Sequence, residues 1–113
     1  MINKKIFMKN NDSGYIGLYG GMDEKDIHVK KRLKTTEKVL DHMGSEELSA
    51  NFFRLTQSEA KLRRENISGQ KSANYAHFVV GEKVRQTIKE LGGTMPEQLP
   101  NKRGRKRVMK ISF

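Results

Sequence analysis

Cysteine is absent from this chain of 113 residues, which excludes a disulfide framework and a zinc site built on thiolates. The composition therefore favours a reducing compartment, and we expect a cytoplasmic protein. No run of about 18 apolar residues occurs, so the sequence predicts no transmembrane helix and no membrane partner. The N-terminal stretch MINKKIFMKN has lysines but lacks the apolar segment that follows the basic end of a signal peptide. These absences argue against the secreted and membrane-spanning classes of protein.

Apolar residues are also scarce for a domain of this size. They make up 35% of the chain against 32% charged residues, and the mean hydropathy is −0.78. A single domain of this length buries about two thirds of the surface that its unfolded chain exposes. We therefore expect some segments to stay flexible or to lie against a partner.

The positive charge is concentrated at the C-terminus. The net charge is +10: residues 1–100 hold 17 Lys and Arg against 13 Asp and Glu, which leaves +4, and residues 101–113 hold six basic residues and no acid, which leaves +6. This distribution predicts a flexible tail that binds a polyanion such as single-stranded DNA. Because the tail has no feature for reading base edges, its binding should be non-specific and weakened by salt. The candidate nucleic-acid-binding residues are Lys102, Arg103, Arg105, Lys106, Arg107 and Lys110.

Three parts can be distinguished along the chain: a lead-in with a Gly/Tyr loop (residues 1–21), a helical domain (residues 22–100) and the basic tail (residues 101–113). The density of Gly, Asn and Asp in NNDSGYIGLYGG predicts a loop over residues 10–21. The glycine spacing of a phosphate-binding loop is absent. The large apolar side chains indicate instead that the loop packs on the domain; they are Tyr15, Ile16, Leu18 and Tyr19.

Helical patterns begin at Met22. The segment DEKDIHVKKRL has acids first and bases last, which complements the helix dipole and predicts a short helix ending near Leu33. Thr35 or Thr36 can cap a second short helix over EKVLDHM, which Gly44 would end.

Two long amphipathic helices come next. The first, over residues 46–66 and capped by Ser45, has an apolar stripe formed by Leu48, Phe52, Leu55 and Leu62. The second extends from about residue 72 to residue 91, and its stripe is Ala73, Ala76, Val80, Val84, Ile88 and Leu91. Gly81 within it suggests close approach of the partner helix. Since the connection is about five residues long, we predict an all-α fold: a small helical domain built on an antiparallel helical hairpin, with one or two shorter N-terminal helices.

The second long helix ends in a strongly marked stop, which we call the strap (residues 92–100). A glycine suits the left-handed residue that ends a helix, and each proline disfavours helical geometry in the residue before it. Met95 and Leu99 are expected to fold back on the hairpin as apolar plugs, whereas Thr94 and Glu97 have no evident partner. The residues that define the strap are Gly92, Gly93, Met95 and Pro96.

No constellation of catalytic or metal-binding residues is evident. His28, His42 and His77 fall on separate elements and lack the spacing of a His-Glu-x-x-His site. No serine lies in a nucleophile elbow, and paired carboxylates stand at helix starts, where the helix dipole explains them. We therefore predict no enzymatic activity, no cofactor and no metal. Weaker candidates for phosphate contacts, in a charge pattern that is more typical of a solvated helix end, are Arg63, Arg64 and Arg85.

Several pieces of the sequence occur, in the same order and with similar spacing, in a known family. Between residues 14 and 100 the chain resembles the C-terminal region of the DNA-damage-inducible protein D (DinD) family. The pieces that carry the resemblance are Gly-Leu-Tyr-Gly-Gly (17–21), Leu-Asp-His-Met-Gly-Ser (40–45), Phe-Arg-x-Thr-Gln (53–57) and Gly-Gly-Thr-Met-Pro-Glu (92–97). The resemblance implies a bacterial protein of the SOS response that modulates a RecA-type recombinase on single-stranded DNA and is not an enzyme. It also implies an additional N-terminal domain of the phage antirepressor (BRO) type, which we expect this chain to lack, while the basic tail departs from the family.

These observations lead to two hypotheses of different classes. The first is a non-enzymatic accessory protein that binds a recombinase filament or another DNA-bound protein through the hairpin and DNA through the tail. The second is a phage antirepressor-related module that forms a homodimer through the helix of residues 23–33 and the Tyr15–Tyr19 loop. A degenerate gene fragment is a further reading of the short length.

Overall fold

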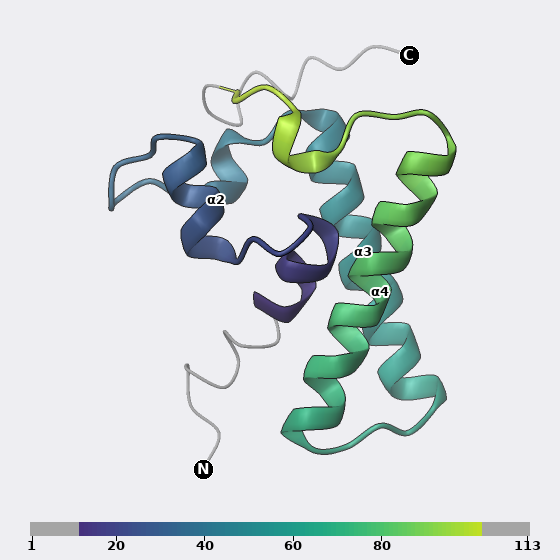
Figure 1. Cartoon of the computed structure of the whole chain (residues 1–113). Helices are drawn as coiled ribbons and strands as arrows, with labels where there is room; N and C mark the ends of the chain where they lie inside the picture. Colours follow the sequence, from purple (N-terminus) through teal and green to yellow (C-terminus); the bar gives the residue numbers. More distant parts are fainter. Residues whose placement is uncertain (1–11, 103–113) are drawn as a thin grey trace.

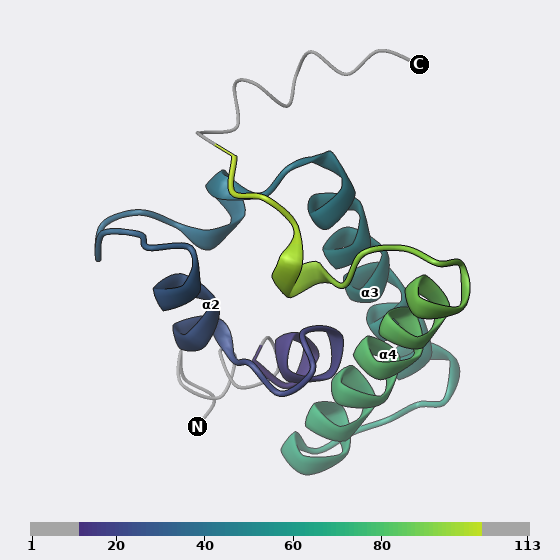
Figure 2. The ribbon, with the colours of Figure 1, turned by 45° about the horizontal axis from the view of Figure 1, so that its top comes forward.

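The computed structural model describes residues 12–102, in which every regular element is helical. Helices α3 and α4 form an antiparallel hairpin, and the shorter elements pack along one side of it (Figures 1 and 2). Residues 65–69 connect the two long helices. These features confirm the predicted all-α class and the hairpin. In chain order the elements are a helix over residues 12–18, α2 (Glu24–Lys30), the 3-10 turn η1 (Val39–His42), α3 (Ser45–Arg64), α4 (Gln70–Glu90) and the 3-10 turn η2 (Pro96–Gln98).

Residues 12–18 form a helix, so the prediction of a loop over residues 10–21 was wrong. Tyr15, Leu18 and Tyr19 are spaced like one face of a helix, and all three are buried. Glycine is frequent here because neighbouring segments press against this helix, and because Gly20 and Gly21 end it with φ of +65° and +109°. The expected packing by apolar side chains is confirmed.

The 12–18 helix lies beside α4 in both ribbon views (Figures 1 and 2). Their backbones meet at two glycines: a Cβ on Gly17 would lie 2.4 Å from the carbonyl oxygen of Phe78, and a Cβ on Gly81 would lie 2.6 Å from that of Gly14. The predicted close approach at Gly81 is therefore confirmed. Its partner is the 12–18 helix, however, rather than the other arm of the hairpin.

Of the two predicted short helices, one forms. Helix α2 begins at a capping box in which the side chains of Asp23 and Asp26 each accept a hydrogen bond from the other's backbone N–H, at 2.9 and 3.1 Å. The second is reduced to η1, without a cap from Thr35 or Thr36. The reason is local, since the Glu37 carboxylate accepts from the N–H of Lys34 at 2.7 Å and closes a turn there.

Helix α3 turns a polar face inward, which contradicts the predicted apolar stripe. Its buried residues recur at helical spacing, and Arg54 among them is 0% exposed. Phe52, by contrast, was placed on the apolar stripe and is 69% exposed. Gly44 takes the N-cap position expected for Ser45. The buried residues of α3 are Glu47, Asn51, Arg54 and Ser58.

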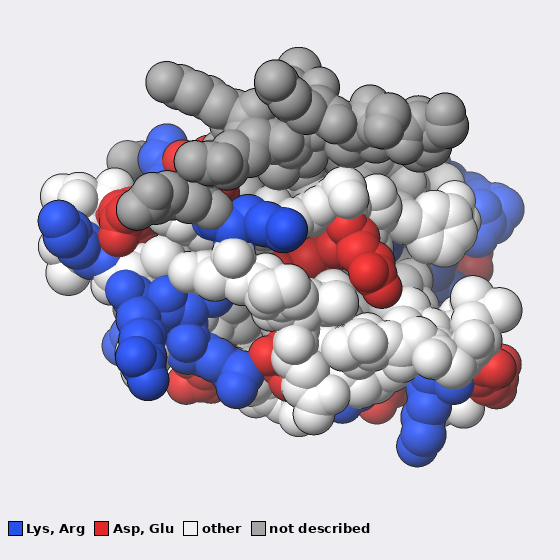
Figure 3. All heavy atoms as spheres, turned by 90° about the horizontal axis from the view of Figure 1, so that it is seen from above, with Lys and Arg blue, Asp and Glu red and all other residues white. Residues whose placement is uncertain are grey.

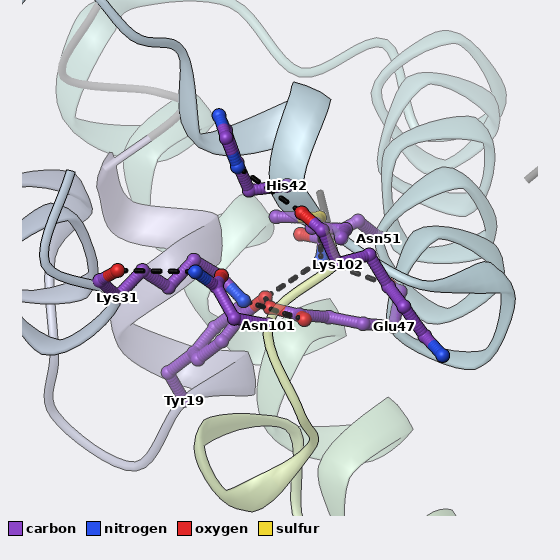
Figure 4. Close-up of polar contacts among 8 residues, drawn as sticks. Tyr19, Lys31, His42, Glu47, Asn51, Asn101 and Lys102 are labelled. Atoms are coloured by element: carbon purple, nitrogen blue, oxygen red, sulfur yellow. Dashed lines mark hydrogen bonds and ion pairs between the residues drawn. The ribbon is translucent and has the colours of Figure 1, made fainter. Parts of the chain in front are cut away.

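A hydrogen-bonded network joins these polar side chains, with Glu47 and Asn51 at its centre (Figure 4), while Arg54 Nη1 is buried without a hydrogen-bond partner among the described residues. The Glu47 carboxylate accepts from the Tyr19 hydroxyl and from Lys31 Nζ at 2.9 Å. Asn51 donates to the Tyr19 hydroxyl at 3.0 Å and accepts from Arg54 Nε at 3.0 Å. Burial, together with the neighbouring Glu47 charge, raises the pKa of Tyr19, so this phenol stays a donor.

The apolar core is built around the same network. The Arg54 guanidinium lies 4.6 Å from the centre of the Tyr15 ring, a cation–π contact, and Tyr15 packs edge-on against Tyr19. Helix α4 contributes Ala76 and Val84, as predicted. The prediction that its apolar stripe extends to Leu91 was wrong, because this side chain is 80% exposed. The core cluster consists of Tyr15, Leu18, Tyr19, Ile27, Val39, Met43 and Val84.

The strap begins as the sequence predicts. Gly92 has a φ of +79°, and the N–H groups of Gly92 and Gly93 return to the carbonyls of Lys89 and Ile88 in a Schellman motif. Pro96 then starts η2 and is the buried residue of the strap, whereas Met95 is half-buried.

Glu97, which had no evident partner in the sequence, holds the strap to the hairpin. Both of its carboxylate oxygens accept from the Arg85 guanidinium, at 2.8 and 3.0 Å. Arg85 Nη1 also donates to the Leu18 carbonyl at 3.1 Å. One arginine therefore ties together α4, the strap and the end of the 12–18 helix.

Replacing Glu47 by Gln should lower the free energy of unfolding by about 3 kcal/mol, because the buried Lys31 ammonium loses its carboxylate. The matched control is Glu46→Gln at the neighbouring exposed position, where we expect a change within about 0.5 kcal/mol. Urea unfolding followed by circular dichroism measures both. Equal effects of the two substitutions would contradict a structural role for the network.

Replacing Glu97 by Gln should cost about 1 kcal/mol at neutral pH, and this cost should vanish in acid. Burial alone would raise the pKa of Glu97, but the hydrogen bonds from Arg85 lower it below its ordinary value of 4.5. A lowered pKa in the folded state means stability that is present above pH 4.5 and lost as the pH falls through the folded value. We therefore expect the melting temperatures of the wild type and Glu97→Gln to converge as the pH falls below 4.5 through the folded value. Glu90→Gln, at an exposed position of α4, is the control for the loss of a surface carboxylate. A difference between the wild type and Glu97→Gln that stays constant from pH 7 to pH 3 would refute the strap contact.

Candidate nucleic-acid and partner-binding surfaces

The basic tail departs from a fixed point on the domain. The Lys102 backbone N–H donates to the His42 carbonyl at 2.9 Å, and the Lys102 carbonyl lies 3.1 Å from His42 Nδ1 (Figure 4). Asn101 Nδ2 donates to the Lys31 carbonyl at 3.1 Å. These contacts attach the first two residues of the tail, which directly follow the strap, to η1 and to the end of α2. The other predicted tail residues lie outside the described part of the chain: Arg103, Arg105, Lys106, Arg107 and Lys110.

The described part of the chain is almost neutral. Residues 12–102 hold 15 Lys and Arg against 13 Asp and Glu, a net charge of +2 out of the +10 of the whole chain. On the face seen in Figure 3, basic side chains form separate groups with acidic ones between them, and a broad area is uncharged. The excess positive charge therefore belongs to residues 1–11 and 103–113.

The structure does not bring the three candidate arginines of the domain together. Arg63 and Arg64 are exposed at the hairpin turn, at the end of α3. Arg85 lies toward the other end of the hairpin, where the bidentate pair with Glu97 occupies it and raises its pKa. A phosphate would have to compete with that carboxylate, so Arg85 has a structural role in this fold.

The histidines do not share a common site. His28 and His42 both contact Glu37: His28 Nε2 lies 2.9 Å from its carbonyl and His42 Nε2 lies 3.5 Å from its carboxylate. His42 also contacts Lys102. His77 is buried, and its pKa is lowered by burial and by the charge of Arg54. Among residues 12–102, no three His, Asp or Glu side chains converge on a point where a metal ion would fit.

An apolar groove between the two long helices was missed by the sequence reasoning. It runs along the seam between α3 and α4, has a volume of about 590 Å³, and is closed at one end by Pro96 and Leu99 of the strap. Phe53 forms part of its wall and is 55% exposed. The apolar residues were visible in the sequence, but their assignment to the core concealed the groove.

The fold buries part of the surface that was predicted to form a homodimer interface. Tyr15, Leu18 and Tyr19 are buried within the chain, so these side chains are unavailable to a second copy. Val29 on α2 remains exposed. None of the described helices is long and apolar enough to cross a bilayer.

Comparison with known proteins agrees with the sequence motifs. The family described as the DinD C-terminal domain matches residues 1–111. DNA damage-inducible protein D of Escherichia coli (strain K12) is 63% identical over 87 residues, which are 77% of this chain and 32% of that relative. This chain thus spans about a third of the length of the relative. No solved structure matches this chain. The match over residues 1–111 places this chain in the family of DinD C-terminal domains.

Proposed function

We propose that this chain is a non-enzymatic accessory protein of the bacterial DNA-damage (SOS) response. It binds a RecA-type recombinase, or another protein held on single-stranded DNA, and changes how the filament assembles. The observation that carries this proposal is the 63% identity to DNA damage-inducible protein D. Because that identity covers a third of the relative, the proposal concerns the part of the activity that a C-terminal domain contributes.

The charge distribution supports a division of labour within the chain. The described domain has a net charge of +2, whereas residues 103–113 hold five basic residues and no acid. Phosphate contacts from such a segment release counterions and give affinity without sequence preference. The tail therefore supplies attraction to DNA, while the nearly neutral hairpin supplies a surface for a protein.

The anchor of the tail supports the same division. Asn101 and Lys102 are tied by backbone and side-chain hydrogen bonds to α2 and η1, away from the turn of the hairpin. A DNA strand that engages the tail leaves the seam of the hairpin accessible. Both contacts can then form at once, which raises the effective concentration of each partner.

We expect the full chain to bind fluorescent single-stranded DNA with an affinity that falls steeply with salt. A version ending at Lys102 keeps the anchor contacts and removes five tail cations, so its log–log salt slope should be smaller by about 3. A double variant, Arg63→Ala with Arg64→Ala, is the matched control and should change the slope by about 1 or less. An unchanged slope after truncation would show that the tail is not the DNA arm.

The recombinase half of the proposal is tested separately. We expect equimolar purified chain to change filament assembly or strand exchange by a RecA-type recombinase, and the version ending at Lys102 to need a severalfold higher concentration. Light scattering and a fluorescent strand-exchange assay measure the two activities. No change in either with the full chain would refute this half of the proposal.

A further inference from the structure

The seam between α3 and α4 is uncovered over much of its length. The groove of about 590 Å³ at the strap end and a second hollow of about 710 Å³ at the turn end share Lys61 and Val79 in their walls. The two hollows therefore adjoin each other along the seam. Its apolar lining includes Ala50, Phe53, Val80, Val84, Ile88 and Leu99.

Large apolar side chains border this seam without a cover from the described residues. Phe53 stands at the strap-end hollow and Tyr75 at the turn-end hollow, and both are more than half exposed. Contiguous apolar surface of this kind on a soluble protein marks a site where another surface binds.

The shape of the seam suits an α-helix. Helix α3 has 20 residues, so the seam extends for about 30 Å at a rise of 1.5 Å per residue. Two antiparallel helices form a groove into which a third helix can pack. Such a groove contacts the apolar side chains at positions i, i+3, i+4 and i+7 of the bound helix. A helix of four or five turns would cover both hollows.

The charges on the rim specify the occupant further. Across both hollows the walls contain four basic residues, Lys61, Arg64, Lys71 and Lys83, and two acids, Glu46 and Glu65. Lys61 and Glu65 neutralise each other in an ion pair of 2.8 Å. Within residues 12–102, Arg64 and Lys83 have no carboxylate at salt-bridge distance. A segment with acidic side chains beside its apolar face complements them.

We propose that the seam between α3 and α4 binds an amphipathic helix of a partner protein, apolar on one face and acidic along its edges. This rests on the proposed function in one respect, because it assigns the protein partner to the hairpin. The apolar lining argues against a nucleic-acid strand, whose phosphates need cations rather than phenylalanine and valine. A second copy of this chain would bring another cationic rim to a seam that already has unpaired cations.

The probe is a synthetic 18-residue helical peptide, labelled with fluorescein, with leucines on one face and glutamates on both flanks. Fluorescence anisotropy with the full chain should show saturable binding. A matched peptide with lysines in place of the glutamates should bind at least tenfold more weakly. Equal binding of the two peptides would overturn the assignment of an acidic partner.

Two adjacent phenylalanines supply the matched variants. Phe53→Ser removes a wall of the groove and should weaken binding of the glutamate peptide at least tenfold. Phe52→Ser alters a side chain that is 69% exposed and absent from the walls of both hollows, so it should change binding by less than twofold. If both variants weaken binding equally, or neither does, the seam is not the site.

The rim is tested by reversing its charge. Arg64→Glu combined with Lys83→Glu should weaken binding of the glutamate peptide and strengthen binding of the lysine peptide, each severalfold. Lys25→Glu with Lys38→Glu, both exposed and outside the seam, is the control and should do neither. If the double variant binds the glutamate peptide more weakly but does not bind the lysine peptide more tightly, the result would contradict the charge complementarity.

The other possible occupants are outcomes of the same variants. If the wild type sediments as a dimer that Phe53→Ser dissociates, the seam holds a second copy and the proposal is wrong. If single-stranded DNA displaces the peptide and Phe53→Ser weakens DNA binding, the seam holds nucleic acid and the proposal is again wrong. Because the peptide assay contains neither DNA nor recombinase, its failure is distinguishable from failure of the proposed function.

Discussion

The buried carboxylate of Glu47 fixes the positions of several segments at once. A carboxylate in the interior costs several kcal/mol unless it is paired and hydrogen-bonded, and here its partners come from distant parts of the chain: the hydroxyl of Tyr19 and the ammonium of Lys31. The backbone of Lys31 in turn accepts from Asn101, which follows the strap. The end of the 12–18 helix, α2 and α3 therefore meet at one polar centre, and a shift that separates Lys31 from Glu47 would leave a buried charge unpaired (Figure 4).

The polar centre also explains why apolar side chains lie on the outside. A helix has one inward face, and α3 uses its own for Glu47, Asn51 and Arg54. Its phenylalanines, at intervening positions, necessarily point elsewhere, and Phe53 lines the seam. The exposed groove and the polar interior are thus two consequences of one rotation of α3.

The sequence predicted what depends on local chemistry. The acids in the first turn of α2, the glycine after α4 and the five-residue turn act through neighbours along the chain, and each was found where expected. The failures concern partners that are distant in sequence. Hydrophobic periodicity predicted an apolar inner face for α3, because the pattern within one helix carries no information on distant partners. Here Tyr19 and Lys31 are the partners that satisfy a polar inner face. The glycines near residue 17 were interpreted as loop formers because the helix that presses on them begins some 50 residues later. The pairing of Glu97 with Arg85 and the groove were hidden for the same reason.

The domain neutralises its own charges, and this determines what is left for binding. Arg85 is engaged by Glu97, Lys31 by Glu47 and Lys61 by Glu65, so a phosphate would have to displace a carboxylate from each of these cations. Long-range attraction to a polyanion then depends on the basic segments at the two ends of the chain, where it acts over about a Debye length and is indifferent to sequence. Recognition of a protein through the seam depends largely on short-range apolar contact, so salt weakens it less than it weakens phosphate binding. Two binding modes that differ in their sensitivity to salt can therefore be separated in one chain by raising the ionic strength.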